Sequence, residues 1–127
     1  ILREKFKGRA KAFRGVKPTL WRDTDWQGQG GTNEFFNTRA AAWWAARMAL
    51  DPTNPRKVAL PPGGDLLTEL AAPRWFMSGQ KIQLEKKEEV VKRIGRSPDL
   101  ADAVVMALWP GAAAEIAESF EIRMGAA

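Results

Sequence analysis

The sequence contains neither cysteine nor histidine. Without cysteine the chain has no disulfide, no zinc finger and no thiol nucleophile. Without histidine, Ser-His-Asp triads and most zinc sites are excluded as well. Any bound metal would therefore be held by oxygen ligands, which points to Mg²⁺ or Mn²⁺. The absence of cysteine also fits a reducing cytoplasm.

Long hydrophobic runs are lacking too. No apolar run approaches the roughly 18 residues that span a membrane, so we expect no transmembrane helix. No basic stretch followed by an apolar one opens the chain, so we expect no signal peptide. The 127 residues, of which 45% are hydrophobic, suit one packed domain or part of one. The first residue is Ile1 and not Met, which hints at a fragment or a processed chain.

Positive charge is concentrated at the start of the chain. Residues 1–22 contain eight basic side chains and a single acid, Glu4. This stretch has a net charge of +7 while the whole chain has +5, which leaves −2 for residues 23–127. Such a pattern is typical of a segment that contacts a polyanion, although a solvated helix surface would give it as well. The candidate DNA-binding residues of this segment are Lys7, Lys11 and Arg14.

The first half of the chain predicts one long helix. Residues 1–9 could close a helix, and residues 12–16 could form a short strand. Residues 23–32 contain three glycines and read as a loop. Asn33 is a suitable N-cap for a helix that runs to Leu50. The residues at helical spacing within it are Phe36, Ala40, Trp43, Trp44 and Arg47.

The second half predicts shorter elements. They are an extended piece over 58–61 and a brief helix that Asp65 could cap and that runs through Leu70. A β-hairpin over 73–86 follows, with its turn at Ser78-Gly79, and then a helix over 87–94 closed by Gly95 in the left-handed conformation. Ser97 is then expected to be the N-cap, and Pro98 the first residue, of a helix that continues to about Trp109. Residues 111–127 are rich in alanine and form either a last helix or a loose tail.

The stretch with the most specific chemistry is Arg-Ser-Pro-Asp-Leu-Ala-Asp, residues 96–102. Asp99 and Asp102 are three residues apart, so a helix that starts at Pro98 presents both carboxylates on one face. The positive end of the helix dipole keeps the pair ionised, and ionised oxygens suit a hard divalent cation. The adjoining apolar face is expected to contain Leu100, Ala103, Val104, Ala107 and Leu108.

A purely structural interpretation of these aspartates is also open. Aspartate is common in a first helical turn, and Asp102 could pair with Arg93 or Arg96. Lys92 and these two arginines could hold phosphates beside a metal, or they could compensate the dipole of the preceding helix. Lys81 lies in the hairpin, and Lys86 and Lys87 follow it. They could contact the DNA backbone, or they could protect the hairpin edge from pairing.

The aromatic and basic residues of the long helix also have two interpretations. Trp43 and Trp44 could stack on bases, but adjacent aromatics in register with other apolar residues are usually buried, and we expect them in the core. Arg39 and Arg47 lie near this apolar stripe. We favour a structural role for both arginines over a phosphate contact.

Four segments together are similar to the large terminase subunit of tailed phages. Residues 35–44 resemble its Asn-x-Arg-Ala-x-x-Trp-Trp helix, and Leu60-Pro61 resembles the Leu-Pro segment before its hairpin. Residues 79–87 and 92–103 resemble its closing block. The order and spacing of the segments fit the family. The resemblance implies that residues 1–127 are the C-terminal half of an RNase H-like nuclease domain of the α/β class, with 111–127 as a tail.

The resemblance also implies a chemistry. Carboxylates of this family bind two Mg²⁺ or Mn²⁺ ions, which activate water and stabilise the leaving oxygen when a phosphodiester is cut. Asp102 takes the role of the C-terminal metal ligand, and Asp99 that of an accessory ligand or of a group that orients water. The implied function is cutting of concatemeric double-stranded DNA during packaging, in the cytoplasm of the bacterial host. The implied partners are the terminase small subunit and the portal.

The chain departs from the family in two respects. Ala41 stands where the family usually has an acid, so a surface charge is lost. The other two metal carboxylates of the family lie upstream of this chain, and Asp23 and Asp25 are poor substitutes because they sit in a glycine-rich loop. The two-metal site is therefore incomplete, and we expect the isolated chain to be inactive. The alternative function is a non-catalytic DNA-binding or docking module, such as a degenerate prophage remnant. No phosphate loop of an ATPase is present.

Overall fold

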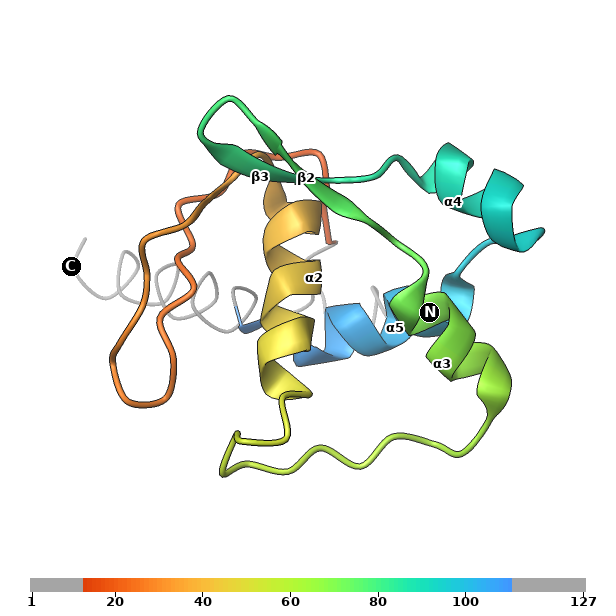
Figure 1. Cartoon of the computed structure of the whole chain (residues 1–127), viewed down its shortest axis with the longest axis horizontal. Coiled ribbons are helices and arrows are strands. Elements are labelled where there is room, and N and C mark those ends of the chain that lie inside the picture. Colours follow the sequence, from red (N-terminus) through yellow and green to blue (C-terminus); the bar gives the residue numbers. More distant parts are fainter. Residues whose placement is uncertain (1–12, 111–127) are drawn as a thin grey trace, which may run out of the picture.

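A computed structural model describes residues 13–110 of the chain and places four helices around a small sheet of three strands (Figure 1). The elements are β1 (Glu34–Phe35), α2 (Thr38–Ala49), α3 (Gly64–Ala71), β2 (Trp75–Ser78), β3 (Lys81–Leu84), α4 (Lys87–Ile94) and α5 (Asp99–Leu108). The α/β class expected from the sequence is confirmed. The expectations for residues 1–12 and 111–127 lie outside the described part. None of the helices within 13–110 is long and apolar enough to cross a bilayer.

The sheet has the strand order β1-β3-β2. Strands β2 and β3 form the predicted hairpin, in which Trp75 pairs with Leu84 and Met77 with Ile82. Gly79 occupies the turn with a φ of 62°, a conformation that favours glycine. Strand β1 pairs parallel to β3. Ile82 and Leu84 are buried, whereas the side chains of Trp75, Phe76 and Met77 on the outer strand are about half exposed.

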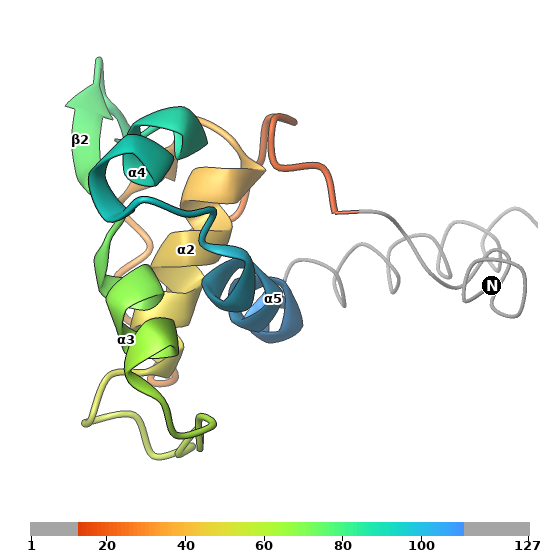
Figure 2. The ribbon, with the colours of Figure 1, turned by 90° about the vertical axis from the view of Figure 1, so that its right-hand side faces the viewer.

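Helix α2 lies between the sheet and α5 (Figure 2). Its N-cap is Asn37, whose side chain accepts a hydrogen bond from the N–H of Ala40 at 2.9 Å. The predicted N-cap, Asn33, was wrong because residues 34 and 35 pair with β3, so the helix can begin only after them. As a result Phe35 is buried at 2% exposure, while Phe36, expected on the apolar stripe, is 47% exposed.

Small side chains on α2 let α5 pack closely against it. Five alanines of α2 are buried, namely Ala40, Ala41, Ala42, Ala45 and Ala46. On α5 the buried residues are Ala101 and Val105, with Trp109 just after the helix. The apolar face predicted for α5 was therefore partly wrong, because Leu100, Ala103 and Ala107 are exposed. Val104 and Leu108 of that face do pack against the core.

Aromatic rings connect the sheet, α2 and the end of α5. Phe35 packs against Trp21 at 5.3 Å and against Trp44 at 5.9 Å between ring centroids. Trp44 in turn meets Trp75 edge-on at 5.2 Å, and Trp21 meets Trp109 at 5.6 Å. Trp43 is buried as well. The expectation that the two adjacent tryptophans of α2 belong to the core is confirmed, and Arg47 stacks over the Trp44 ring at 4.8 Å.

The segment before the sheet does not form the expected strand. Residues 13–16 form no strand and lead into a turn, and the carbonyls of Gly15 and Lys17 pair with the start of α2. The carbonyl of Lys17 accepts hydrogen bonds from the N–H and the hydroxyl of Thr38, at 2.8 and 3.0 Å, and the carbonyl of Gly15 accepts from the N–H of Arg39 at 2.9 Å. A Cβ at position 15 would come within 3.0 Å of the Arg39 Cβ, so this approach favours glycine.

Three smaller expectations concern loops and caps. The loop over 23–32 is confirmed and closes through a bridge between Thr24 and Gly30. No strand forms over 58–61. Helix α3 begins at Gly64, so Asp65 lies in its first turn and does not cap it.

Candidate metal centre

Asp99 and Asp102 lie in the first turn of α5, as expected, and one lysine bridges them. The Lys87 Nζ donates to Asp102 Oδ2 at 2.9 Å and lies 3.7 Å from Asp99 Oδ1. The Asp102 side chain is the more enclosed, with 24% of its surface exposed against 79% for Asp99. The structure thus brings the two predicted carboxylates together around a single cation, at the rim of the core.

Lys87 is the first residue of α4, and its ammonium is the nearest counter-charge of the pair. The hydrogen bond to Asp102 raises the pKa of Lys87, against a smaller opposite effect of burial. Lys87 therefore stays protonated at neutral pH and places a positive charge beside both carboxylates. Arg93 and Arg96, the partners expected for Asp102, bind other acids. From the sequence, Lys87 was interpreted as a DNA contact or as protection of the hairpin edge, because nothing local links it to a residue that lies 15 positions later.

Arg39 contributes a second positive charge from α2. Its Nη1 donates to the carbonyl of Glu85 at 2.7 Å, while its buried Nη2 has no hydrogen-bond partner within residues 13–110. Burial lowers the pKa of Arg39, and the charges of Asp102, Glu88 and Glu85 oppose that effect. The structural role favoured for Arg39 fits these contacts, since its side chain ties α2 to the segment between β3 and α4.

Glu69 on α3 is a buried acid that was not among the residues predicted from the sequence. Its Oε1 accepts hydrogen bonds from the N–H groups of Leu100 at 2.9 Å and Ala101 at 3.3 Å, and its Oε2 accepts from Arg96 Nε at 3.1 Å. The two amides belong to the first turn of α5. The signal in the sequence that could have indicated this buried acid was its position between the apolar Leu66 and Leu70 of a short helix.

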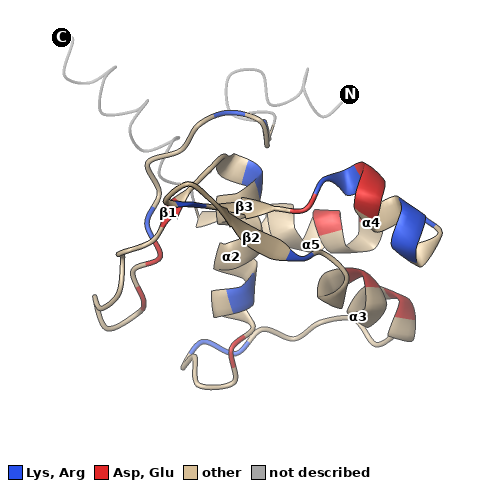
Figure 3. Cartoon of the chain, turned by 45° about the horizontal axis from the view of Figure 1, so that its top comes forward, with Lys and Arg blue, Asp and Glu red and all other residues tan. Residues whose placement is uncertain are grey.

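The three basic residues just before the aspartate pair are held by acids of the chain. Lys92 pairs with Glu89 at 3.3 Å. Arg93 forms a two-pronged pair with Glu85, at 2.8 and 2.7 Å, and also donates to the carbonyl of Ala72. Arg96 pairs with Glu69. Figure 3 shows how charges of both signs gather on α3, α4 and the start of α5. These ion pairs support the structural interpretation of the three residues, whereas no observation tests their contact with DNA.

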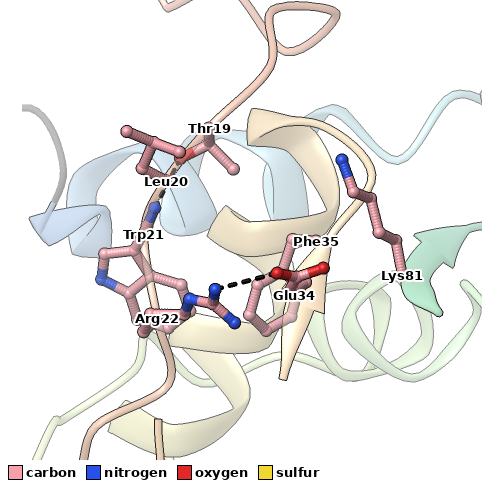
Figure 4. A pocket seen from close by; sticks show the side chains of 7 residues that line it. All are labelled: Thr19, Leu20, Trp21, Arg22, Glu34, Phe35 and Lys81. Atoms are coloured by element: carbon pink, nitrogen blue, oxygen red, sulfur yellow. Dashed lines mark hydrogen bonds and ion pairs between the residues drawn. The ribbon is translucent and has the colours of Figure 1, made fainter. Parts of the chain in front are cut away.

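Lys81 and Arg14 are exposed and form no ion pair within residues 13–110. Lys81 lies at a small surface hollow beside an ion pair between Arg22 and Glu34, whose atoms are 2.9 Å apart (Figure 4). The hollow is lined by Thr19, Leu20, Trp21, Arg22, Glu34, Phe35 and Lys81. Lys7 and Lys11, the other candidates of the basic segment, lie outside the described part of the chain.

The carboxylates present fit one corner of a metal site. Asp99 and Asp102 offer the oxygen donors that Mg²⁺ and Mn²⁺ prefer, and they already share a cationic partner in Lys87. Within residues 13–110, however, no group of three or more potential metal-ligand residues is found. Asp23 and Asp25 do not supplement the pair, because they organise the glycine-rich loop: Asp23 accepts from Asn33, and Asp25 accepts from Gln27 and Gln29.

Ala41 is buried, contrary to the expectation that a surface charge is lost at this position. Its exposure is 0%, and it lies on the face of α2 that is packed in the core. An acid at this position would be buried in this structure. The surface interpretation of this departure from the family was therefore wrong.

No protein-family model and no curated protein sequence matches the chain. Among solved structures, it is similar to a variant of the nuclease domain of the large terminase subunit gp2 of bacterial virus Sf6, solved with manganese and beta-thujaplicinol. The two are 25% identical, with a TM-score of 0.56, over 83% of this chain and 56% of that domain. The chain therefore spans little more than half of the domain that it matches. It has the fold of part of a phage large-terminase nuclease domain, and the resemblance seen in its motifs is confirmed.

Proposed function

We propose that this chain is the C-terminal half of a terminase nuclease domain and takes part in metal-dependent cutting of concatemeric double-stranded DNA. The observation that carries the proposal is the pair Asp99 and Asp102, gathered on one cation at the start of α5. The fold around the pair is similar to a terminase nuclease domain solved with manganese. By "the complete protein" we mean the longer terminase in which we place this chain.

Asp102 is the better candidate for a direct metal ligand. Its carboxylate is partly enclosed, and its Oδ2 is hydrogen-bonded, so its direction is defined. Asp99 is more exposed and is bound by the Ser97 hydroxyl at 2.6 Å, which suits an accessory role. When bound, Mg²⁺ or Mn²⁺ would ease the ionisation of the attacking water and stabilise the departing oxygen. Lys87 and Arg39 supply positive charge beside the carboxylates.

We propose double-stranded DNA as the substrate, with the terminase small subunit and the portal as partners in the host cytoplasm. Lys81 and Arg14 suit contacts with phosphates, because they are exposed and free of ion pairs within residues 13–110. Lys92, Arg93 and Arg96 would have to share their ion pairs with a phosphate. The alternative, a non-catalytic DNA-binding or docking module, has no specific observation in its favour.

Replacement of Asp102 by asparagine in the complete protein tests the proposal. We expect Asp102→Asn to abolish plasmid cleavage with Mg²⁺ or Mn²⁺ while DNA affinity stays close to that of the wild type. The change is nearly isosteric, and the phosphates are held by basic groups elsewhere. The matched control is Asp51→Asn, an exposed acid after α2 whose carboxylate accepts hydrogen bonds from Thr53, away from the aspartate pair. A folded Asp102→Asn protein that cuts at the wild-type rate would refute the metal role.

A further inference from the structure

Helix α5 begins without a cap of its own. The residue at its N-cap position is Pro98, whose side chain offers no acceptor. Ser97, expected from the sequence to be the cap, donates its hydroxyl to Asp99 Oδ1 at 2.6 Å instead. The first amides of a helix have no partner within the helix, so these N–H groups need an acceptor from elsewhere.

Glu69 supplies that acceptor from α3. Its Oε1 receives the N–H groups of Leu100 and Ala101, and its Oε2 is held by Arg96. The Glu69 side chain is only 3% exposed. Arg96 is in turn fixed by the carbonyl of Asp65 at 3.2 Å and by its carboxylate at 3.4 Å. Both oxygens of Glu69 are therefore engaged, and the carboxylate has a defined orientation.

The two amides held by Glu69 lie between the two candidate ligands in the sequence. Leu100 follows Asp99 directly, and Ala101 precedes Asp102. Fixing these amides fixes the backbone from which both carboxylates project. A change in the first turn of α5 would redirect both carboxylates together.

We propose that Glu69 is a positioning residue for the metal corner: it holds the first turn of α5 so that Asp99 and Asp102 face a divalent cation together. This inference rests on the proposed function. Glu69 is not itself proposed as a metal ligand, because its carboxylate is buried and occupied by hydrogen bonds. Residues that orient metal ligands commonly change metal affinity by about 10- to 100-fold when they are replaced.

The test measures Mn²⁺ binding to the complete protein by calorimetry, together with hydrogen exchange at the amides of Leu100 and Ala101. We expect Glu69→Ala to weaken Mn²⁺ binding by about tenfold or more and to speed exchange at both amides. Glu69→Gln keeps an acceptor of the same reach for the two amides and loses only the acceptor for Arg96, so it should retain most of the Mn²⁺ affinity.

A shorter acid separates position from charge. Glu69→Asp keeps the negative charge but loses one methylene of reach, so it should bind Mn²⁺ more weakly than Glu69→Gln. A purely electrostatic role would give the opposite order, and that order would overturn the proposal. The comparison needs only Glu69→Asp and Glu69→Gln, so it tests the positioning role even if Glu69→Ala does not fold.

Two controls complete the design. Leu66→Val removes buried volume from the same helix without touching the amides of α5, and it should lower stability but leave Mn²⁺ affinity unchanged. An equal loss of Mn²⁺ affinity in Leu66→Val would show that Glu69 acts only by stabilising the fold. Asp102→Asn must weaken Mn²⁺ binding if the proposed function holds. If it does so while Glu69→Ala binds Mn²⁺ like the wild type, only the positioning role fails.

Discussion

At the scale of single residues, four cations within residues 13–110 fall into two groups. Arg93 and Arg96 form hydrogen-bonded pairs with Glu85 and Glu69, two carboxylates that are largely buried. Lys81 and Arg14 are exposed and bind no acid within the described residues. Position along the sequence did not separate the groups, since all four are basic residues near candidate functional segments. The structural interpretation therefore predicts that residues of the first group affect stability, and the DNA-binding interpretation predicts that residues of the second group affect DNA binding.

Replacing one residue from each group distinguishes these interpretations. Arg93→Gln should lower the free energy of unfolding by about 1–3 kcal/mol, because it leaves the carboxylate of Glu85 without its charged hydrogen bonds. Lys81→Ala should leave stability nearly unchanged, since an exposed single charge contributes little. In the complete protein, Lys81→Ala should instead reduce the salt dependence of DNA binding by about one unit of slope.

Urea unfolding and DNA titrations over a range of salt concentrations provide these measurements. Arg14→Ala serves as a second member of the exposed group. An unchanged salt slope for both Lys81→Ala and Arg14→Ala would show that these residues are solvated and do not contact DNA. A stable Arg93→Gln with a reduced slope would reverse the assignment of the two groups.

At the scale of elements, local signals were enough where neighbours in the sequence decide the structure. The hairpin followed from alternating apolar residues, and α4 ended at Gly95 because a left-handed φ of 78° favours glycine. Asp99 and Asp102 were likewise found from a local motif. The start of α2 was missed because a distant strand, β3, recruits residues 34 and 35.

The buried face of α5 and the partners of its aspartates depend on contacts that are distant in sequence. The helix has apolar residues on more than one side, and packing against α2 selects Ala101 and Val105. Lys87 is 15 residues from Asp102, and Glu69 is 31 residues from Leu100. No spacing rule within one helix connects such residues. The sequence therefore indicated the aspartate pair, whose role as metal ligands stays a prediction, but not the groups that neutralise and hold it.

The close approach of α2 and α5 predicts strong sensitivity to side-chain volume. Ala41→Leu should lower the free energy of unfolding by about 1–3 kcal/mol, because the position is fully buried and extra methylenes force its neighbours apart. Ala107→Leu on α5 is the matched control, since that alanine is exposed and the same change should cost little. Chemical denaturation of both variants checks the difference. Equal stability of the two variants would show that the interface is loosely packed.

At the scale of the whole molecule, the site that we propose is only one corner of a two-metal centre. It covers 56% of the nuclease domain to which it is similar. Asp99 and Asp102 are not joined by a third potential ligand anywhere between residues 13 and 110. A pair of ions that acts on both the attacking and the departing oxygen needs ligands on each of them. The carboxylates of this corner would have to be complemented by others in the complete protein.

The isolated chain is therefore expected to show no appreciable nuclease activity with Mg²⁺ or Mn²⁺. A plasmid-nicking assay on the purified 127-residue chain, with the complete protein as the positive control, checks this expectation. Robust cleavage that disappears in Asp102→Ala would show that the missing ligands lie within this chain.

Two tryptophan pairs of the core also provide an intrinsic spectroscopic probe of folding. Trp44 and Trp75 meet at 5.2 Å with their rings at 84°, and Trp21 and Trp109 meet at 5.6 Å and 60°. Indole transitions at such separations couple, so each pair adds an exciton signal to the circular dichroism of the folded chain. One pair joins the hairpin to α2, and the other joins the loop before β1 to the end of α5. Replacing one member of each pair by phenylalanine would assign the two signals, so that detachment of the hairpin could be followed separately from that of the loop.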